Sequence, residues 1–462
     1  MTGIETAPGA EAGVPQFAGD VGFNVIGYLS SATGLGAAAR SSIALIHSLG
    51  YPVSCADIDL NHLSGLTGVE QPPDACPYVS EIRDLPYRIN FFAFNPSDAM
   101  AHVVRWRKKT GVQLFDRFNC VVPFWELPRV PEHWVAALAA MDAVLVPSKF
   151  VEDAIRAGFG DRPLPPLIRY PQSVTPPEGL VAHRRRWLGE RAGTTAVLVT
   201  FDVLSDIERK NPWASIAAFQ CAFGPDEKVT LLVKVNNSAT VASSAGMVRL
   251  RDLAASDPRI VLMCDPLTRA DLWNLYASCD IYMSLHRAEG LGLGPMEAMS
   301  LGKPVIATGW SGNMDFMDET NSIPVPYGMI PVGRTKGSYR DHAAQSWADP
   351  SIAAASAALR LLTFDPDRRA AIGKRAAETI TAIADSPARA AAIDAIAKMA
   401  AAGNPASAEH RAHADVMRSA PYRAWGLVGR LRFAAGSVLR AIGVKPPIGP
   451  PVLGSHGGSD SR

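Results

Sequence analysis

Two glutamates with seven residues between them lie in a glycine-rich segment, residues 284–315, which reads S-L-H-R-A-E-G-L-G-L-G-P-M-E-A-M-S-L-G-K-P-V-I-A-T-G-W-S-G-N-M-D. Glu289 comes shortly after a predicted strand, and glycines that let a ligand approach the main chain follow it. Pro295 predicts that a helix begins there, with Glu297 in its first turn and Gly302 just after its end.

This order of residues favours a ligand that carries both phosphate and hydroxyl groups. The unpaired N–H groups and the partial positive charge at a helix N-terminus bind phosphate oxygens. Carboxylates bind phosphate poorly but accept hydrogen bonds from sugar hydroxyls. A sugar nucleotide has both kinds of group. The simpler interpretation is a glycine-rich turn in which Glu297 only compensates the helix dipole.

Two adjacent cations, Arg209 and Lys210, follow another predicted strand in the segment F-D-V-L-S-D-I-E-R-K-N-P, residues 201–212. Ligands of open parallel sheets bind at the carboxyl ends of the strands, so this pair lies at the appropriate edge. Arginine can clamp a diphosphate with its planar fork, and lysine acts as a point charge. The alternative is a solvated loop.

The loop of residues 30–36, S-S-A-T-G-L-G, follows the first predicted strand and opens a helix. Gly34 and Gly36 would there approach a diphosphate or an acceptor. The rival interpretation is an NAD site, because Asp57 and Asp59 end the next strand, but the third glycine of that motif is missing. Residues 57–59 read D-I-D, and we take their resemblance to a metal-binding motif as coincidence.

Four further residues are candidates for sugar or acceptor contacts. Trp125 and Glu126 end a predicted strand in P-F-W-E-L-P-R, where the tryptophan can stack on a sugar and the glutamate can accept hydrogen bonds. The alternative is a core tryptophan beside an exposed glutamate. His286 lies near Glu289 and is either a ligand contact or an ordinary loop histidine. Asn313 belongs to a turn whose backbone N–H groups can bind the sugar.

The elements that must position these residues alternate between strands and helices. The chain has 462 residues, 48% hydrophobic and 19% charged, with a formal net charge of +1, so no preference for nucleic acid is expected. Repeated strand–helix units predict an α/β protein with two doubly wound parallel sheets. The predicted strands are residues 21–27, 52–57, 88–94, 119–125, 143–147, 196–201, 228–235, 259–264, 280–285 and 304–308. The predicted helices include 36–49, 97–108, 131–140, 148–157, 211–223, 241–255 and 268–278, and alanine-rich helices fill about 351–402.

Composition divides the chain further. We expect a disordered lead at 1–20, one domain at 21–175, a second at 176–402, and an extension at 403–462; a linker near 172–192 joins the two domains. Residues 422–443 predict a basic amphipathic helix that either contacts a membrane or packs on the body. The N-terminus lacks the apolar core of a signal peptide. We expect all six cysteines to be reduced thiols in a cytoplasmic protein, which could lie peripherally at the inner face of the membrane.

Three segments resemble the retaining glycosyltransferases of glycosyltransferase family 4. They are residues 284–315, R-K-N-P with the A-A-F helix after it, and W-E-L-P followed by D-A-V-L-V-P-S-K-F; the resemblance spans about residues 22–385. It implies a GT-B fold, in which two Rossmann-like domains face each other across a cleft.

The resemblance also implies a role for each site residue. Glu297 would accept hydrogen bonds from the ribose, and Glu289 would hold the transferred sugar near its 3-hydroxyl. Arg209 and Lys210 would neutralise the leaving diphosphate. Many members place the clamp arginine several residues before the lysine, where this chain has V-L-S-D-I-E. The backbone that would touch sugar or phosphate is that of Gly290, Leu291 and Gly292.

The expected activity is metal-independent, front-face, retaining transfer of a hexose from a nucleotide-diphosphate sugar to a glycan or lipid-linked acceptor, with no cofactor. One alternative is a sugar-nucleotide epimerase on the same fold. Another is a catalytically silent protein that binds sugar nucleotides or acts as a scaffold.

Overall fold

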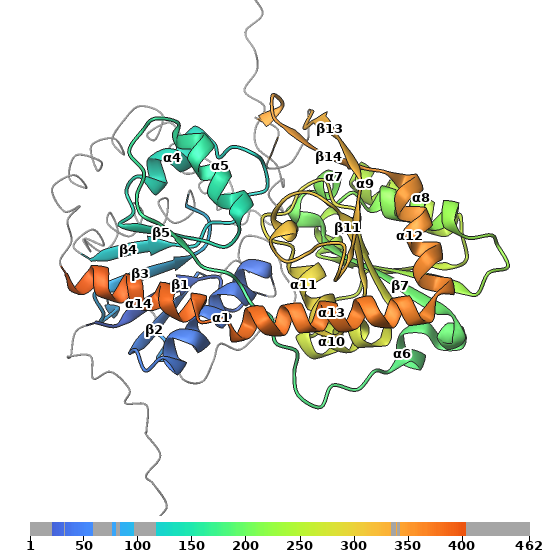
Figure 1. Cartoon of the computed structure of the whole chain (residues 1–462), viewed down its shortest axis with the longest axis horizontal. Coiled ribbons are helices and arrows are strands. Elements are labelled where there is room, and N and C mark those ends of the chain that lie inside the picture. The colour runs from blue at the N-terminus through green and yellow to red at the C-terminus, as the bar shows by residue number, and fades with distance from the viewer. Residues whose placement is uncertain are drawn as a thin grey trace, which may run out of the picture. The chain divides into compact units, whose positions relative to one another are not determined.

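The computed structural model describes residues 21–31, 33–58, 76–79, 84–96, 117–333, 339 and 342–402. It confirms the α/β fold class and the two parallel sheets (Figure 1). The predicted lead 1–20, the helix 97–108 and the basic helix 422–443 lie outside the described residues, as does Asp59. Within the described part of the chain, every helix is too short or too polar to cross a membrane.

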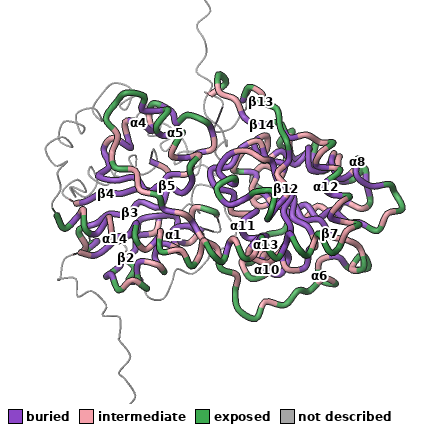
Figure 2. Tube along the Cα trace, viewed as in Figure 1, coloured by how far each residue is buried: buried purple, intermediate pink, exposed green. Residues whose placement is uncertain are grey.

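The N-terminal sheet is parallel throughout and has the strand order β2-β1-β3-β4-β5-β6. Its central strands are buried and largely apolar, such as I-N-F-F-A in β3, as a sheet covered on both faces requires. Figure 2 shows these strands in the colour of buried residues. The elements are β1 (Phe23–Gly27), α1 (Gly34–Ser48), β2 (Val53–Asp57), β3 (Ile89–Ala93), β4 (Phe118–Val121), α4 (Glu132–Leu138), β5 (Ala143–Val146), α5 (Lys149–Phe159) and β6 (Leu167–Arg169).

The C-terminal sheet is also parallel, with the order β12-β11-β10-β7-β8-β9. Its longest strands, β7 and β8, pair over eight residues each and lie in the middle of the hydrophobic core. The elements are α6 (Arg184–Leu188), β7 (Thr195–Asp202), α7 (Ile207–Lys210), α8 (Pro212–Ala222), β8 (Val229–Asn236), α9 (Ala245–Ala255), β9 (Ile260–Met263), α10 (Arg269–Ser278), β10 (Ile281–Ser284), α11 (Leu293–Ser300), β11 (Val305–Thr308), β12 (Ile323–Val325), α12 (Ile352–Phe364) and α13 (Pro366–Asp385), with the antiparallel pair β13 (Tyr327–Pro331) and β14 (Ser346–Pro350).

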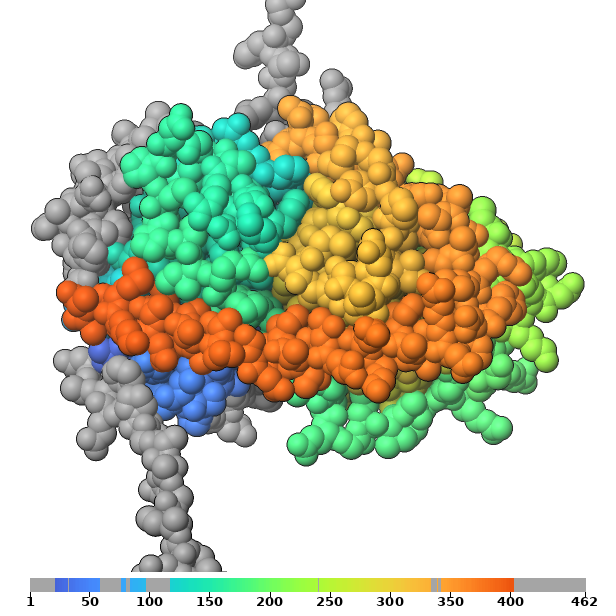
Figure 3. All heavy atoms as spheres, viewed as in Figure 1, coloured from blue at the N-terminus to red at the C-terminus, as the bar shows by residue number. Residues whose placement is uncertain are grey.

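The last described helix, α14 (Ala388–Ala401), packs on the N-terminal sheet although it follows the C-terminal sheet in sequence. Ile393 and Ile396 are fully buried in the core that contains β1, β3 and α1. The band formed by α13 and α14 is visible on the surface in Figure 3. Sequence order alone assigned residues 176–402 to the second domain, whereas the side chains of α14 complete the core of the first.

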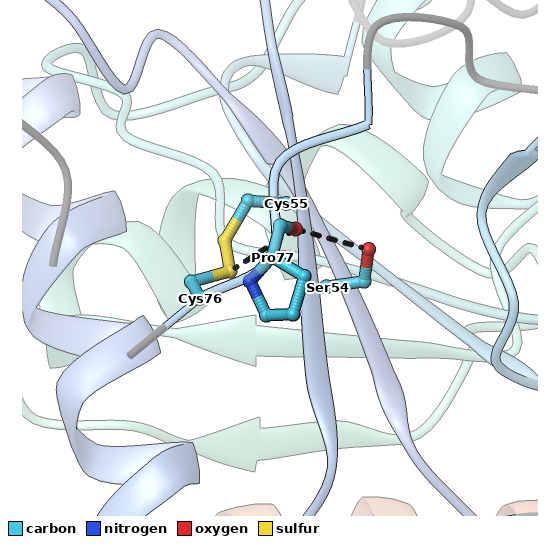
Figure 4. Close-up of a disulfide and its surroundings, with 4 residues drawn as sticks. All are labelled: Ser54, Cys55, Cys76 and Pro77. Atoms are coloured by element: carbon cyan, nitrogen blue, oxygen red, sulfur yellow. Dashed lines mark hydrogen bonds between the residues drawn. A yellow bond between two sulfur atoms is a disulfide. The ribbon is translucent and has the colours of Figure 1, made fainter. Parts of the chain in front are cut away.

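The prediction that all six cysteines are reduced is wrong for Cys55 and Cys76, which form a disulfide (Figure 4). Residues 76–79 run beside β2, because the Cys55 N–H donates to Pro77 O and the Val79 N–H donates to Cys55 O, both at 3.0 Å. This pairing brings the two Cα atoms to 6.1 Å, a separation that a disulfide can bridge. The other four cysteines are free thiols.

Candidate functional site

The chain places Arg209 and Lys210 on the single turn of α7, just after β7. Asp206 caps this turn by accepting hydrogen bonds from the N–H groups of Glu208 and Arg209. Asn211 ends it in the left-handed conformation, with φ of 49°. No helix was predicted between the strand at 196–201 and the helix at 211–223, because four residues are too few to show helical periodicity. It holds both cations at the carboxyl end of the C-terminal sheet.

Both cations contact the carboxylate of Glu289. Lys210 Nζ lies 2.5 Å from Glu289 Oε1, and Arg209 Nη1 lies 3.1 Å from Oε2. Arg209 also donates to the carbonyl of Ala288 at 2.7 Å. The structure therefore brings together the three residues that the sequence predicted as the chemical centre.

The centre extends to Glu126, which follows a strand of the N-terminal sheet. Glu126 Oε1 lies 3.7 Å from Arg209 Nη2, and Tyr339 donates its hydroxyl to Oε2 at 2.6 Å. Arg209 is only 3% exposed, so its charge is balanced by Glu126 and Glu289 rather than by water. Glu126 was a predicted site residue, whereas Tyr339 was not, because its surroundings in sequence carry no motif.

The ionisation of Glu289 follows from these neighbours. Burial by itself would raise the pKa of Glu289, but the charges of Lys210 and Arg209 outweigh it and lower the pKa to about 2. Burial and the guanidinium of Arg209 lower the pKa of Lys210 from its usual range. The centre thus presents a fixed carboxylate and at least one permanent cation at neutral pH.

The glycine-rich loop after Glu289 differs from the prediction at the start of its helix. Helix α11 begins at Leu293, two residues before Pro295, because Gly292 adopts a φ of +97° and forms the N-cap. Glu297 therefore lies beyond the first turn. Among the described residues, we find no acceptor in the chain for the N–H groups of Gly290, Leu291 and Gly292. These groups point to an anion-binding loop.

Two contacts fix this loop from either side. Ser148, which caps α5, donates its hydroxyl to Gly290 O at 2.5 Å. On the other side, the Gly312 N–H donates to Glu289 O at 2.8 Å. A side chain on Gly312 would come within 2.2 Å of Gly290 O, so the loops can approach only with glycine there.

Glu297 belongs to a second group of residues. Its Oε1 lies 2.6 Å from Arg269 Nη2 at the start of α10, and Arg269 lies over the ring of Trp273 at 4.6 Å. Glu297 lines a cavity of about 540 Å³ that is also bordered by α1 and by Leu293. Arg269 was not predicted, since an arginine after a helix cap is ordinary in sequence.

Three other candidates are integrated into the protein interior. His286 is fully buried, with Nδ1 3.1 Å from Ser284 Oγ and Nε2 3.1 Å from Asn313 Oδ1. Burial lowers the pKa of His286, which favours the neutral ring. Asn313 is also fully buried and donates to Thr308 O at 3.0 Å. Trp125, 6% exposed, donates its indole N–H to the carbonyl of Arg129.

The first loop of the N-terminal sheet opens α1. Thr33 caps the helix by accepting from the Gly36 N–H at 3.3 Å, and a side chain on Gly34 would meet Leu293 of α11 at 3.1 Å. Asp57 accepts from the Leu29 N–H at 2.7 Å. That carboxylate therefore fixes the loop, which is a structural role different from the ribose contact of a dinucleotide site.

The two parallel six-stranded sheets with their covering helices define a GT-B fold. Solved structures with this arrangement cover 82% of the chain. They include HepE from Anabaena in complex with UDP and glucose (14% identity, 99% of that chain, TM-score 0.55), and sucrose-phosphate synthase from Thermosynechococcus elongatus (16% identity, 96% of that chain, TM-score 0.54). A glycosyltransferase from Rickettsia africae has a TM-score of 0.57 at 13% identity, over 82% of this chain and 98% of its own.

Sequence comparison adds a more specific similarity. Residues 260–322, which contain Glu289 and Glu297, match the family model described as glycosyl transferases group 1. The chain is 32% identical over 139 residues to D-inositol 3-phosphate glycosyltransferase from Kineococcus radiotolerans. That match covers 29% of this chain and 27% of the relative.

Proposed function

We propose that the protein is a retaining glycosyltransferase that moves a hexose from a nucleotide-diphosphate sugar to a glycan or lipid-linked acceptor. The observation that carries the proposal is the ionised Glu289, bound by Arg209 and Lys210 beside a loop whose N–H groups have no acceptor among the described residues. The match of this segment to glycosyl transferases group 1 supports it. So does the GT-B fold, since the similar structure of HepE contains UDP and glucose.

Each group has a defined part in the proposed reaction. The bond between the anomeric carbon and the leaving phosphate oxygen breaks, and negative charge develops on the diphosphate. Lys210, Arg209 and the N–H groups of the glycine loop stabilise that charge. Glu289 accepts hydrogen bonds from the sugar hydroxyls and so orients the ring, while Glu297 exchanges its contact with Arg269 for the ribose hydroxyls.

The acceptor attacks from the face that the diphosphate leaves. A bond forms between the acceptor oxygen and the anomeric carbon, and the acceptor proton passes to a diphosphate oxygen, so the configuration is retained. The proposal requires no metal, because fixed cations stabilise the leaving group. In the proposal, Glu126 and Tyr339, which lie beside Arg209, contact the sugar or the acceptor.

A panel of nucleotide sugars tests the proposal, first by thermal shift and then by turnover with candidate acceptors. A donor that binds the native protein raises its melting temperature. NMR of the product should show the anomeric configuration of the donor. Lys210→Ala should abolish transfer, and the control Lys374→Ala, on a side chain that is 79% exposed, should leave it unchanged.

Other outcomes would contradict the proposal. Conversion of the donor to an isomeric nucleotide sugar without an acceptor would identify an epimerase. Donor binding without turnover with any acceptor would identify a silent binding protein. Transfer with inversion would refute the front-face mechanism while leaving the transferase assignment in place.

A further inference from the structure

A buried arginine without a carboxylate partner lies at one end of the cavity that Glu297 lines. Arg389, at the start of α14, is 7% exposed and borders this cavity of about 540 Å³. Its hydrogen-bond partners are hydroxyls: Ser173 Oγ at 2.5 Å, Ser41 Oγ at 3.0 Å and Tyr170 OH at 3.5 Å. No carboxylate of a described residue lies within ion-pair distance of this guanidinium.

This environment is unfavourable for a cation on its own. Transfer of a charge from water to a protein interior is compensated only by an opposite charge or by a full set of hydrogen bonds. Nε of Arg389 is buried and makes no hydrogen bond. Hydroxyl dipoles and the ring of Tyr170, 5.3 Å from the guanidinium, give partial compensation.

The position of Arg389 in its helix adds to the excess of positive charge. It is the second residue of α14, a helix of 14 residues, and the preceding Pro387 provides no side-chain cap. A helix N-terminus carries a partial positive charge, so a cation there is disfavoured and an anion is favoured. The helix end therefore does not compensate the charge of the guanidinium and adds to the need for an anion beside it.

The rest of the cavity wall agrees with this. Its charged side chains are three arginines and one glutamate, and the glutamate, Glu297, is paired with Arg269. Arg40 directs its guanidinium to the carbonyls of Leu29 and Ser31. Hydroxyl groups of Ser41, Ser173 and Thr175 border the same space and can donate to an anion.

We propose that this cavity binds a second, phosphate-bearing small molecule, whose anion is the counter-ion of Arg389. The site is separate from the Arg209–Lys210–Glu289 centre and lies beyond the ribose end of the proposed donor site. Its walls come from α1, from the linker at 172–175 and from α10, α11 and α14. A phosphomonoester bound there contacts both halves of the chain and stabilises their assembled form.

The test uses the full chain in a phosphate-free buffer at constant ionic strength, once without UDP and once with UDP at saturation. Inorganic phosphate and glycerol 3-phosphate should each raise the melting temperature in a saturable way, whereas glycerol should not. Arg389→Gln should weaken this phosphate effect at least tenfold. The matched control Arg368→Gln, on an exposed position of α13, should retain it.

A second variant tests the same contact in case Arg389→Gln does not fold. Ser173→Asp places a carboxylate next to the guanidinium, so it should raise the melting temperature without phosphate and remove the response to phosphate. With donor present, glycosylation of glycerol 3-phosphate would identify the anion as part of an acceptor. A changed transfer rate with glycerol 3-phosphate recovered intact would identify an effector.

Three results would overturn the proposal: an equal phosphate response in wild type and Arg389→Gln, no saturable response in wild type, or loss of the response when UDP is added. The last would mean that phosphate occupies the donor site. Failure of transfer activity does not affect these measurements, so this inference and the proposed function can fail separately.

Discussion

Replacing Glu289 with glutamine removes the charge at the centre of the site and keeps the size of the side chain. The pKa of Glu289 falls from 4.5 to about 2 in the folded protein, and the residue is 8% exposed. Each pKa unit corresponds to about 1.4 kcal/mol, so the ionised carboxylate contributes about 3 kcal/mol to stability. Breaking a buried ion pair by removing one partner has a similar effect, about 3–5 kcal/mol.

Glu289→Gln should therefore lower the free energy of unfolding by about 3 kcal/mol at pH 7, measured by urea denaturation. In a domain of this size that corresponds to a loss of roughly 6–12 °C in melting temperature. The control is Glu378→Gln, whose partner Lys374 is 3.9 Å away and whose side chain is 62% exposed. An exposed pair of this kind contributes at most about 0.5 kcal/mol.

The pH dependence of the difference has a definite sign. A carboxyl whose folded pKa is lowered stabilises the protein above its unfolded pKa, and this stabilisation is lost as pH falls through the folded pKa. The gap between wild type and Glu289→Gln should be constant above about pH 5 and close as pH falls towards 2. A variant as stable as wild type at pH 7, or a gap that widens on acidification, would refute the charge cluster.

Three further predictions concern neighbouring features. Burial and Arg209 lower the pKa of Lys210, so kcat/KM should fall at alkaline pH, where this lysine loses its proton. Lys210→Arg should move that fall to higher pH. An alkaline part of the pH profile that is unchanged in the variant would exclude Lys210 as its cause. Burial raises the pKa of Asp142 to about 6, so the stability that its neutral form contributes is lost as pH rises through this value. In urea denaturation at pH 4 and pH 8, Asp142→Asn should remove about 2 kcal/mol of the difference between the two pH values, and an equal difference in the variant would contradict this. Gly292→Ala should lower the free energy of unfolding by about 1–3 kcal/mol, because φ is +97° and the added methyl group would lie 3.1 Å from the Cβ of Asn313. The control Gly193→Ala, whose methyl group would meet no atom within 4 Å, should leave the melting temperature unchanged, and equal melting temperatures of the two variants would contradict this.

The strands and the chemical centre could be predicted because both depend on local patterns. Buried strands of this fold are mostly apolar runs, and the two cations and Glu289 lie in the connections that follow two such runs. In a parallel sheet, strand ends meet at one edge, so sequence positions far apart become neighbours in space. The Lys210–Glu289 contact follows from that rule.

Other features depend on conformation or on distant segments. Pro295 is compatible with the first turn because its missing N–H has no partner there, so it does not fix the first residue of α11; the φ of Gly292 does. The disulfide of Cys55 and Cys76 requires residues 76–79 to pair with β2, and no periodicity predicts this pairing. The packing of α14 on the first sheet is likewise a tertiary contact.

For Trp125 and His286, the sequence left a ligand contact and a structural role open for a common physical reason. An aromatic or imidazole ring at a strand end can point to a ligand or into the core. The sequence pattern is the same in both cases, so it does not distinguish the two orientations. Here Trp125 packs against Trp134, with ring centres 4.9 Å apart, and His286 bonds to Asn313. Both support the loops that carry Glu126 and Glu289.

The most direct test of the account is a crystal structure of the protein with an intact nucleotide sugar selected by thermal shift. The account predicts diphosphate oxygens within hydrogen-bond distance of Lys210 and Arg209, sugar hydroxyls on the carboxylate of Glu289, and the ribose on Glu297. A nucleotide sugar bound elsewhere, with Lys210 and Glu289 still paired only to each other, would contradict it.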